Sequence, residues 1–176
     1  MITSSRLARI AGSVLLAAVV VAAVSGCGYT VGGSLPSHIR TVGVPIFGNQ
    51  TSEPGVEALI TRAIVEAFST NGRLQVVPPA DADSVLEGEV VAHQLVSIAF
   101  DPRANVQQYR LVVRLNVRFR DVRQNRVLFE AAGLEERADF RVAASAADTI
   151  SLEETALRTA AVDIARAVIN AAIEQF

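Results

Sequence analysis

The sequence is poor in the side chains that carry out most enzyme chemistry. It contains no tryptophan, one cysteine and only two histidines, His38 and His93, which lie far apart in the chain. No glycine-rich phosphate-binding loop follows an expected strand, and aromatic residues make up only 5% of the chain. These absences argue against an enzyme, and against a solute-binding protein with a deep aromatic pocket.

Positive charge comes from arginine alone, because the chain has no lysine. The 16 basic residues are outnumbered by 18 acidic ones, and the formal net charge is −2 at pH 7. Nucleic-acid-binding domains are normally basic overall. The charge balance therefore argues against a nucleic-acid partner.

The acidic residues do not have the spacing of a metal site. Asp81 and Asp83 are close in sequence but lack further ligands in a suitable loop. Glu87 and Glu89 share one face of an expected strand, and pairing with arginines of a neighbouring strand explains them more simply than catalysis does. We expect neither catalytic residues nor a metal site.

The N-terminal segment has the pattern of a bacterial export signal. Arg6 and Arg9 form a short basic region, and an apolar stretch follows over residues 10–24. A transmembrane helix needs about 20 apolar residues, so this stretch is short for a membrane span. Its length and its basic flank are those of a signal peptide.

The only cysteine follows that apolar stretch directly. Residues 24–27 read Val-Ser-Gly-Cys, the pattern of a lipobox. We expect cleavage between Gly26 and Cys27, followed by covalent lipid on Cys27, a diacylglyceryl group and an N-acyl chain such as palmitate. An ordinary secretory signal is the alternative, but it would leave a lone free thiol in an oxidising compartment.

The lipid anchor predicts where the protein lies. Two or more acyl chains hold a protein stably to a membrane, since each buried methylene contributes about 0.8 kcal/mol. Position 28 is glycine, so no aspartate retention signal follows Cys27, which is compatible with transfer to the outer membrane. We expect a protein anchored at the periplasmic face of the outer membrane.

The part of the chain after the signal suits one domain. Residues 1–26 are the expected signal peptide, residues 27–38 a tether rich in glycine, serine and proline, and residues 39–176 the folded domain. Because the tether is short, we expect the domain to lie close to the membrane.

Hydrophobic periodicity predicts five strands and two helices in the order β-α-β-β-β-β-α. The strands are expected over residues 39–47, 74–77, 84–100, 109–119 and 127–140, and the helices over residues 53–70 and from Ser151 onward. Half-buried strands and one-faced helices predict an α+β fold. We expect a two-layer sandwich in which both helices pack on one face of a mostly antiparallel, four- to five-stranded sheet.

The first strand contains a proline, which predicts its place in the sheet. Val42, Val44 and Ile46 recur with period 2 and would share one face. Pro45 lacks a backbone donor, so we expect an edge strand or a strand with one free side.

Three signals predict helix boundaries and strand faces. Asn71-Gly72 is a natural stop for the first helix. Ser151 and Glu154 form a capping box that predicts the start of the second. His93 falls on the polar side of the alternation in its strand.

One strand face carries the only candidate binding constellation. Apolar residues over 109–119 alternate with Arg110, Arg114 and Arg118, and Arg120 follows. The planar guanidinium suits phosphates and carboxylates, so the row is a candidate anion-binding or partner-binding surface. The alternative is a solvated face neutralised by acidic residues, namely Glu87, Glu89, Glu130 and Glu136.

A series of short motifs runs through residues 27–176. In order they are Cys27-Gly28-Tyr29 at the lipidation site, Leu35-Pro36, residues 39–49, Pro54-Gly55-Val56-Glu57 at a helix start, residues 82–88 entering a long strand, and an alanine-rich terminal helix. As an ordered set they resemble the LPS-assembly lipoprotein family LptE.

The resemblance implies a non-enzymatic role and a fold of two helices against a four-stranded sheet. Such proteins are anchored in the outer membrane, plug and help to assemble the β-barrel LptD, and bind lipopolysaccharide. We therefore expect an LptD-like barrel, lipopolysaccharide and the membrane as partners, with no cofactor beyond the lipid on Cys27. The alternative is an outer-membrane lipoprotein that regulates a peptidoglycan synthase or forms part of a secretion complex.

Overall fold

The computed structural model describes residues 35–174, so the predicted signal peptide, the cleavage site and Cys27 lie outside the described residues. The elements are β1 (Thr41–Gly43), β2 (Gly48–Asn49), α2 (Val56–Asn71), β3 (Gln75–Val76), a 3-10 turn (Pro79–Asp81), β4 (Ser84–Phe100), β5 (Val106–Asp121), β6 (Arg126–Arg141), α3 (Ala146–Ile169) and a π-helical turn (Asn170–Glu174). Within residues 35–174, no helix combines the length and the apolar character needed to cross a membrane.

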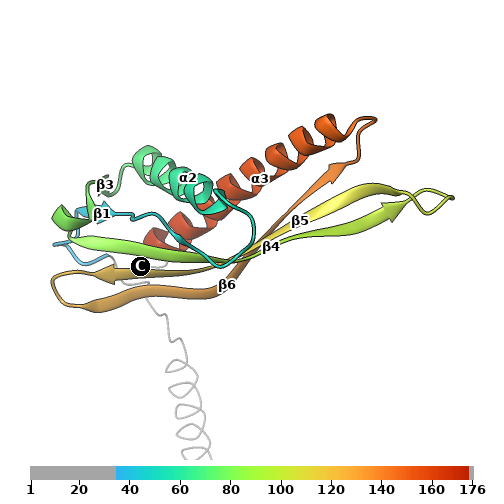
Figure 1. The fold of residues 1–176 in the computed structure, drawn as a ribbon. Helices are drawn as coiled ribbons and strands as arrows, with labels where there is room; N and C mark the ends of the chain where they lie inside the picture. The colour runs from blue at the N-terminus through green and yellow to red at the C-terminus, as the bar shows by residue number, and fades with distance from the viewer. Residues whose placement is uncertain (1–34, 175–176) are drawn as a thin grey trace, which may run out of the picture. The chain divides into compact units, whose positions relative to one another are not determined.

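The strands form one mixed sheet, and both helices lie on the same side of it (Figure 1). The strand order is β3-β1-β4-β5-β6, and β2 also pairs with β4. β4, β5 and β6 are antiparallel, whereas β1 and β2 run parallel to β4. The predicted α+β fold is confirmed, but the sheet has six strands rather than four to five and is mixed.

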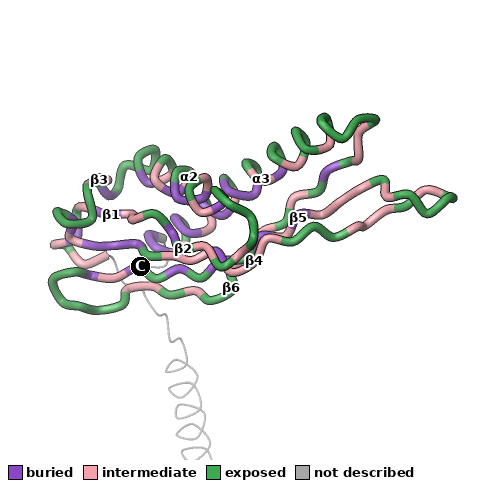
Figure 2. The backbone as a smooth tube through the Cα atoms, in the orientation of Figure 1, coloured by how far each residue is buried: buried purple, intermediate pink, exposed green. Residues whose placement is uncertain are grey.

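The hydrophobic core lies between the sheet and the two helices, where buried residues concentrate in Figure 2. β5 alternates buried and outward-facing residues as predicted. The largest fully buried side chains are Phe68, Phe119, Ile60, Ile64, Leu86, Leu111, Leu115 and Ile164. α3 contributes mostly alanine to this layer, which lets the helix lie close to its neighbours.

The strand predicted over residues 39–47 is two short strands, β1 and β2. β1 ends at Gly43, before Pro45, and it lies between β3 and β4. The prediction of an edge strand is therefore wrong, because Pro45 falls outside the hydrogen-bonded part. The period-2 pattern fails at the same point, since Val42 is fully buried but Ile46 is 74% exposed.

The helices begin elsewhere than predicted. α2 begins after Gly55, which has a positive φ of 88°, and it ends as predicted at Gly72, with φ 71°. α3 begins at Ala146, so Ser151 lies inside the helix and its predicted role as cap is wrong. Ser145 is the cap, because its hydroxyl oxygen accepts a hydrogen bond of 3.1 Å from the Asp148 amide.

This cap gives a first testable prediction. Ser145→Ala should lower the free energy of unfolding by about 1 kcal/mol, because the Asp148 amide loses its acceptor. Ser151→Ala should change it by less than about 0.5 kcal/mol, since that hydroxyl caps nothing. Chemical denaturation of both variants measures the difference, and equal losses would contradict the assignment.

A β-bulge in β4 changes which residues face the helices. Val90 pairs with Leu115 and Ala92 with Arg114, so Val91 has no partner. Because the extra residue reverses the alternation, His93 lies opposite the buried Val113 on the helix-facing side. The prediction that His93 lies on the polar side is therefore wrong.

A second bulge interrupts β6, and it lies beside the same part of β5 as the bulge in β4. Ala132 and Gly133 together oppose Asn116 of β5. Gly133 has a positive φ of 72°, and its amide donates a 2.9 Å hydrogen bond to Oδ1 of Asn116. The part of the three long strands beyond the bulges, residues 92–100, 106–115 and 134–141, is called here the distal half. The part before them, residues 84–90, 116–121 and 126–131, is the proximal half.

Candidate functional site

The predicted row of arginines lies on the open face of the sheet, away from the helices. Along β5 these residues alternate with buried side chains. Arg110 and Arg114 lie in the distal half, and Arg118 and Arg120 lie in the proximal half. The sequence therefore placed all four arginines on the correct face.

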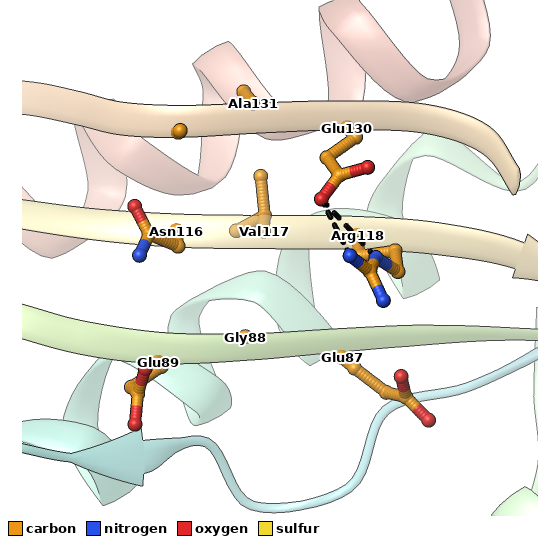
Figure 3. A pocket seen from close by; sticks show the side chains of 9 residues that line it. Glu87, Gly88, Glu89, Asn116, Val117, Arg118, Glu130 and Ala131 are labelled. Carbon is orange, nitrogen blue, oxygen red and sulfur yellow. Dashed lines mark hydrogen bonds and ion pairs between the residues drawn. The ribbon is translucent and has the colours of Figure 1, made fainter.

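Each arginine of the row pairs with a carboxylate of a neighbouring strand. The shortest nitrogen–oxygen distances are 2.7 Å for Arg110–Asp139, 2.5 Å for Arg114–Glu135, 2.7 Å for Arg118–Glu130 and 3.3 Å for Arg120–Glu87. Figure 3 shows Arg118 and Glu130 directed toward each other across two strands. The open face is thus a ladder of ion pairs, as the alternative interpretation predicted.

The partners differ in part from those expected. Glu87 and Glu130 are ion-pair partners as predicted, but Asp139 and Glu135 take the places expected for Glu89 and Glu136. Glu136 pairs in register with the buried Val113, so it lies on the helix-facing side. The reason is the bulge in β6, which shifts the alternation of every residue beyond it.

Hydrogen bonding shifts the pKa of some of these groups in the direction that favours their charged form. The hydrogen bond from Arg110 lowers the pKa of the Asp139 carboxyl. Hydrogen bonds from Arg114 and then Arg137 lower the pKa of Glu135. The hydrogen bond to Glu130 raises the pKa of Arg118.

The two halves of the open face nevertheless differ in net charge. The distal half carries four arginines and two carboxylates, namely Arg110, Arg114, Arg137, Arg141, Glu135 and Asp139. The proximal half carries two arginines and three carboxylates, namely Arg118, Arg120, Glu87, Glu89 and Glu130. The distal half therefore has an excess of two positive charges and the proximal half an excess of one negative charge.

Arg137 and Arg141 are the residues that sequence reasoning missed. Glu135 is shared between Arg114 and Arg137, since its two oxygens each accept from one of them. The alternation in the sequence of β6 does not reveal this, because the bulge at Gly133 changes which of its residues face outward.

A shallow pocket of about 340 Å³ lies on the proximal half (Figure 3). Glu87 and Glu89 come from β4, Arg118 from β5 and Glu130 from β6. Because carboxylates outnumber guanidinium groups here, the pocket does not favour an anion. The anion-binding potential of the open face lies in the distal half.

A buried carboxylate joins the start of the domain to the end of β5. Asp121 is fully buried, and its Oδ2 lies 2.8 Å from Nε2 of His38. The backbone amide of Gln124 donates to its other oxygen at 3.0 Å. Sequence reasoning placed His38 in the tether and missed this link.

Asp83 likewise has a structural role. Its carboxylate accepts hydrogen bonds from the Arg40 amide and the Thr41 hydroxyl and pairs with Arg123 at 2.9 Å. The Arg40 amide is the main cause that lowers the pKa of Asp83. Among residues 35–174 no three histidine, cysteine or acidic side chains are grouped so as to hold a metal ion.

Several solved structures share this fold. Rare lipoprotein B from Shewanella oneidensis has 15% identity and a TM-score of 0.52, covering 73% of this chain and 91% of that one. A lipoprotein B from Nitrosomonas europaea has 17% identity and a TM-score of 0.52, with 81% and 88% covered. The PelC dodecamer from Paraburkholderia phytofirmans has 18% identity and a TM-score of 0.51, with 79% and 92% covered. At these identities the similarity shows the fold alone.

Comparison at the level of sequence is more specific. No curated protein sequence gives a significant match. The family model for LptE, described as lipopolysaccharide-assembly, matches residues 39–172, which is nearly all of the folded part. The chain therefore belongs to the LptE family of lipopolysaccharide-assembly lipoproteins.

Proposed function

We propose that the protein is anchored to the periplasmic face of the outer membrane through acyl chains on Cys27. There it plugs and helps to assemble an LptD-like β-barrel and takes part in lipopolysaccharide transport and insertion. The observation that carries this proposal is the family match over residues 39–172. The lipobox at residues 24–27 supports the anchor.

Purification under native conditions tests the proposed partner. The lipidated protein, tagged at its C-terminus and extracted from membranes in mild detergent, should retain an LptD-like barrel. A Cys27→Ser variant, which cannot be lipidated, should leave the membrane fraction when the barrel is depleted. Recovery of a penicillin-binding protein or of secretion components would favour the alternative functions instead.

We further propose that the open face of the distal half binds the anionic head group of lipopolysaccharide. Arg110 and Arg114 keep 38% and 45% of their side chains exposed, so phosphates can reach them. Arg137 and Arg141 raise the number of guanidinium groups in this half to four, against the two carboxylates of Glu135 and Asp139. Guanidinium groups bind phosphate oxygens through paired hydrogen bonds, which suits the phosphates of lipid A.

The difference in charge between the halves gives a testable prediction. Replacing Arg110 and Arg114 together by glutamine should weaken lipopolysaccharide binding about tenfold at low salt, because it removes the excess positive charge. Replacing Arg118 and Arg120 by glutamine should weaken it by no more than about twofold, since their surroundings are acidic. Binding of purified protein to labelled lipopolysaccharide measures both. Unchanged binding of the first variant would remove this surface from the proposal.

A further inference from the structure

The outer edge of β6 lies open beside α3. Among the described strands β6 pairs only with β5, and Figure 1 shows α3 running close to its second half. A groove of about 500 Å³ lies between them. Its strand wall consists of residues 137–141, and its helix wall of Leu152, Thr155, Ala156 and Thr159.

This edge is regular where the groove lies. From Leu134 to Arg141 each residue of β6 pairs in unbroken register with β5. The stretch contains neither a proline nor a bulge, two of the devices by which proteins block an exposed edge, although five of its eight residues are charged. The proximal part of β6, by contrast, is interrupted by register shifts. The distal edge thus presents an uninterrupted series of backbone donors and acceptors, and none of the described strands lies beside it.

The hydroxyl groups on the helix wall of the groove already have hydrogen-bond partners within α3, so an occupant need not bind them. The hydroxyl groups of Thr155 and Thr159 donate to the carbonyls of Ser151 and Thr155 at 2.9 and 3.0 Å. Leu152 is 39% exposed, although it is a large apolar side chain, and Ala156 is buried. An occupant should therefore direct apolar side chains toward α3.

The opposite side of the same edge is positively charged. Arg141 makes no ion pair with a carboxylate among residues 35–173, and Arg137 shares Glu135 with Arg114. Asp139 is already bound by Arg110 through two hydrogen bonds. An occupant should therefore direct acidic side chains toward the open face.

We propose that residues 134–141 of β6 bind an extended segment of a partner protein as an additional strand. Its side chains alternate between apolar residues toward α3 and acidic residues toward Arg137 and Arg141. Successive strand residues point to opposite faces, so one segment satisfies both sides. An acyl chain fits less well, because it would cover the backbone N–H and C=O groups of the edge without pairing them. The inference does not depend on lipopolysaccharide binding.

Synthetic peptides test this mode of binding on the mature lipidated protein in detergent micelles. The probe is acetyl-Glu-Val-Asp-Leu-Glu-Val-Asp-amide. It should protect from hydrogen exchange the alternate amides of residues 134–141 that do not already donate to β5. A peptide of the same sequence with every backbone amide N-methylated has no N–H group to donate to the edge and should not bind. A version with lysine at every acidic position should bind about tenfold more weakly.

Variants of the protein test the strand side and the helix side of the groove separately. Replacing Arg137 and Arg141 by glutamate should weaken binding of the acidic peptide about tenfold. The same change of charge at Arg62 and Arg73, which are exposed elsewhere, should leave it unchanged. Thr155→Trp fills the groove from the helix side and should abolish binding without touching the core.

Three results would overturn the proposal. The first is no binding of the acidic peptide at millimolar concentration. The second is equal binding of the N-methylated peptide, which would show that the strand edge is not used. The third is displacement of the peptide by palmitate, which would identify an acyl-chain groove.

Discussion

Gly88→Val is expected to lower the free energy of unfolding by about 3 kcal/mol. Gly88 lies opposite Val117 on the helix-facing side of β4, and the ring of Phe47 packs directly on it. A Cβ at this position would stand 2.5 Å from Cδ2 and Cζ of that ring. The ring cannot easily move, because Phe47 is buried and its amide donates to the buried Thr61 hydroxyl at 3.1 Å.

Two further variants show whether the clash is the cause. Ala92→Val lies in the same strand but on the open face, and should change stability by less than about 0.5 kcal/mol. Phe47→Ala combined with Gly88→Val should be less destabilised than the sum of the two single variants, since the alanine makes room for the new side chain. Denaturant unfolding of the native protein, of Phe47→Ala and of the three variants named above measures these changes. Additive losses would show that the ring and the new side chain do not interact.

Asp121→Ala should lower the free energy of unfolding by about 2–3 kcal/mol, the second largest effect that we expect. The substitution leaves the Gln124 amide and the His38 ring without their buried acceptor. Asp121→Asn keeps an acceptor oxygen and should lose less. Asp81→Ala, at an exposed position, serves as the control and should be near neutral. Thermal and chemical unfolding of the three variants provide the ranking. If the alanine and asparagine variants lost equal stability, the charge rather than the acceptor would be responsible.

The same carboxylate gives a dependence on pH. Burial raises the pKa of Asp121, but hydrogen bonds from the Gln124 amide and from His38 outweigh it, so the pKa lies below the ordinary 3.8. A lowered pKa in the folded state means that the ionised group stabilises the fold above its unfolded pKa. That stabilisation is lost as the pH falls through the folded pKa.

Comparison with Asp121→Asn isolates this effect. The difference in stability between the native protein and the variant should be constant above about pH 5 and should shrink below about pH 4. Denaturant unfolding of both proteins, measured from about pH 5 down to about pH 2, records how this difference changes. A difference that grew on acidification would have the wrong sign and would contradict the assignment.

The sequence predicts the fold well where one periodicity runs without interruption. β5 has no extra residue in its central part, so the alternation of Leu111, Val113 and Leu115 with arginine identifies both faces correctly. The stripe of apolar residues in α2 likewise predicts its buried side, since a helix keeps its period from end to end. Burial of one face was therefore sufficient to define these elements.

Prediction failed where a single residue changes the phase or where two signals compete. Val91 reverses the faces of β4, and nothing in its local sequence distinguishes an extra valine from a paired one. Ser145 and Ser151 are both followed three residues later by an acidic residue, and only the structure shows which one caps α3. Pro45 predicted an edge strand, but it lies beyond the end of β1, which has a neighbouring strand on each side.

The face of the candidate site could be predicted from one strand, but the pairing of its residues across strands could not. The arginines of β5 share a face because they belong to one strand with a constant period. Their partners depend on register across strands, which places Asp139 beside Arg110 and Glu135 beside Arg114. The link between His38 and Asp121 joins residues 83 positions apart, and no local pattern encodes such a contact.

The two bulges also determine where the chain can change length. Deleting Val91 would leave Val90 and Ala92 opposite the same residues of β5 as before, and deleting Ala132 would leave Gly133 opposite Asn116. In the regular stretches of these strands, loss of one residue would turn every following side chain to the wrong face. Alignments of related chains should therefore place one-residue insertions and deletions at these two positions. An alignment that moves such a gap even two positions along the strand would interchange the core and the open face for the residues between.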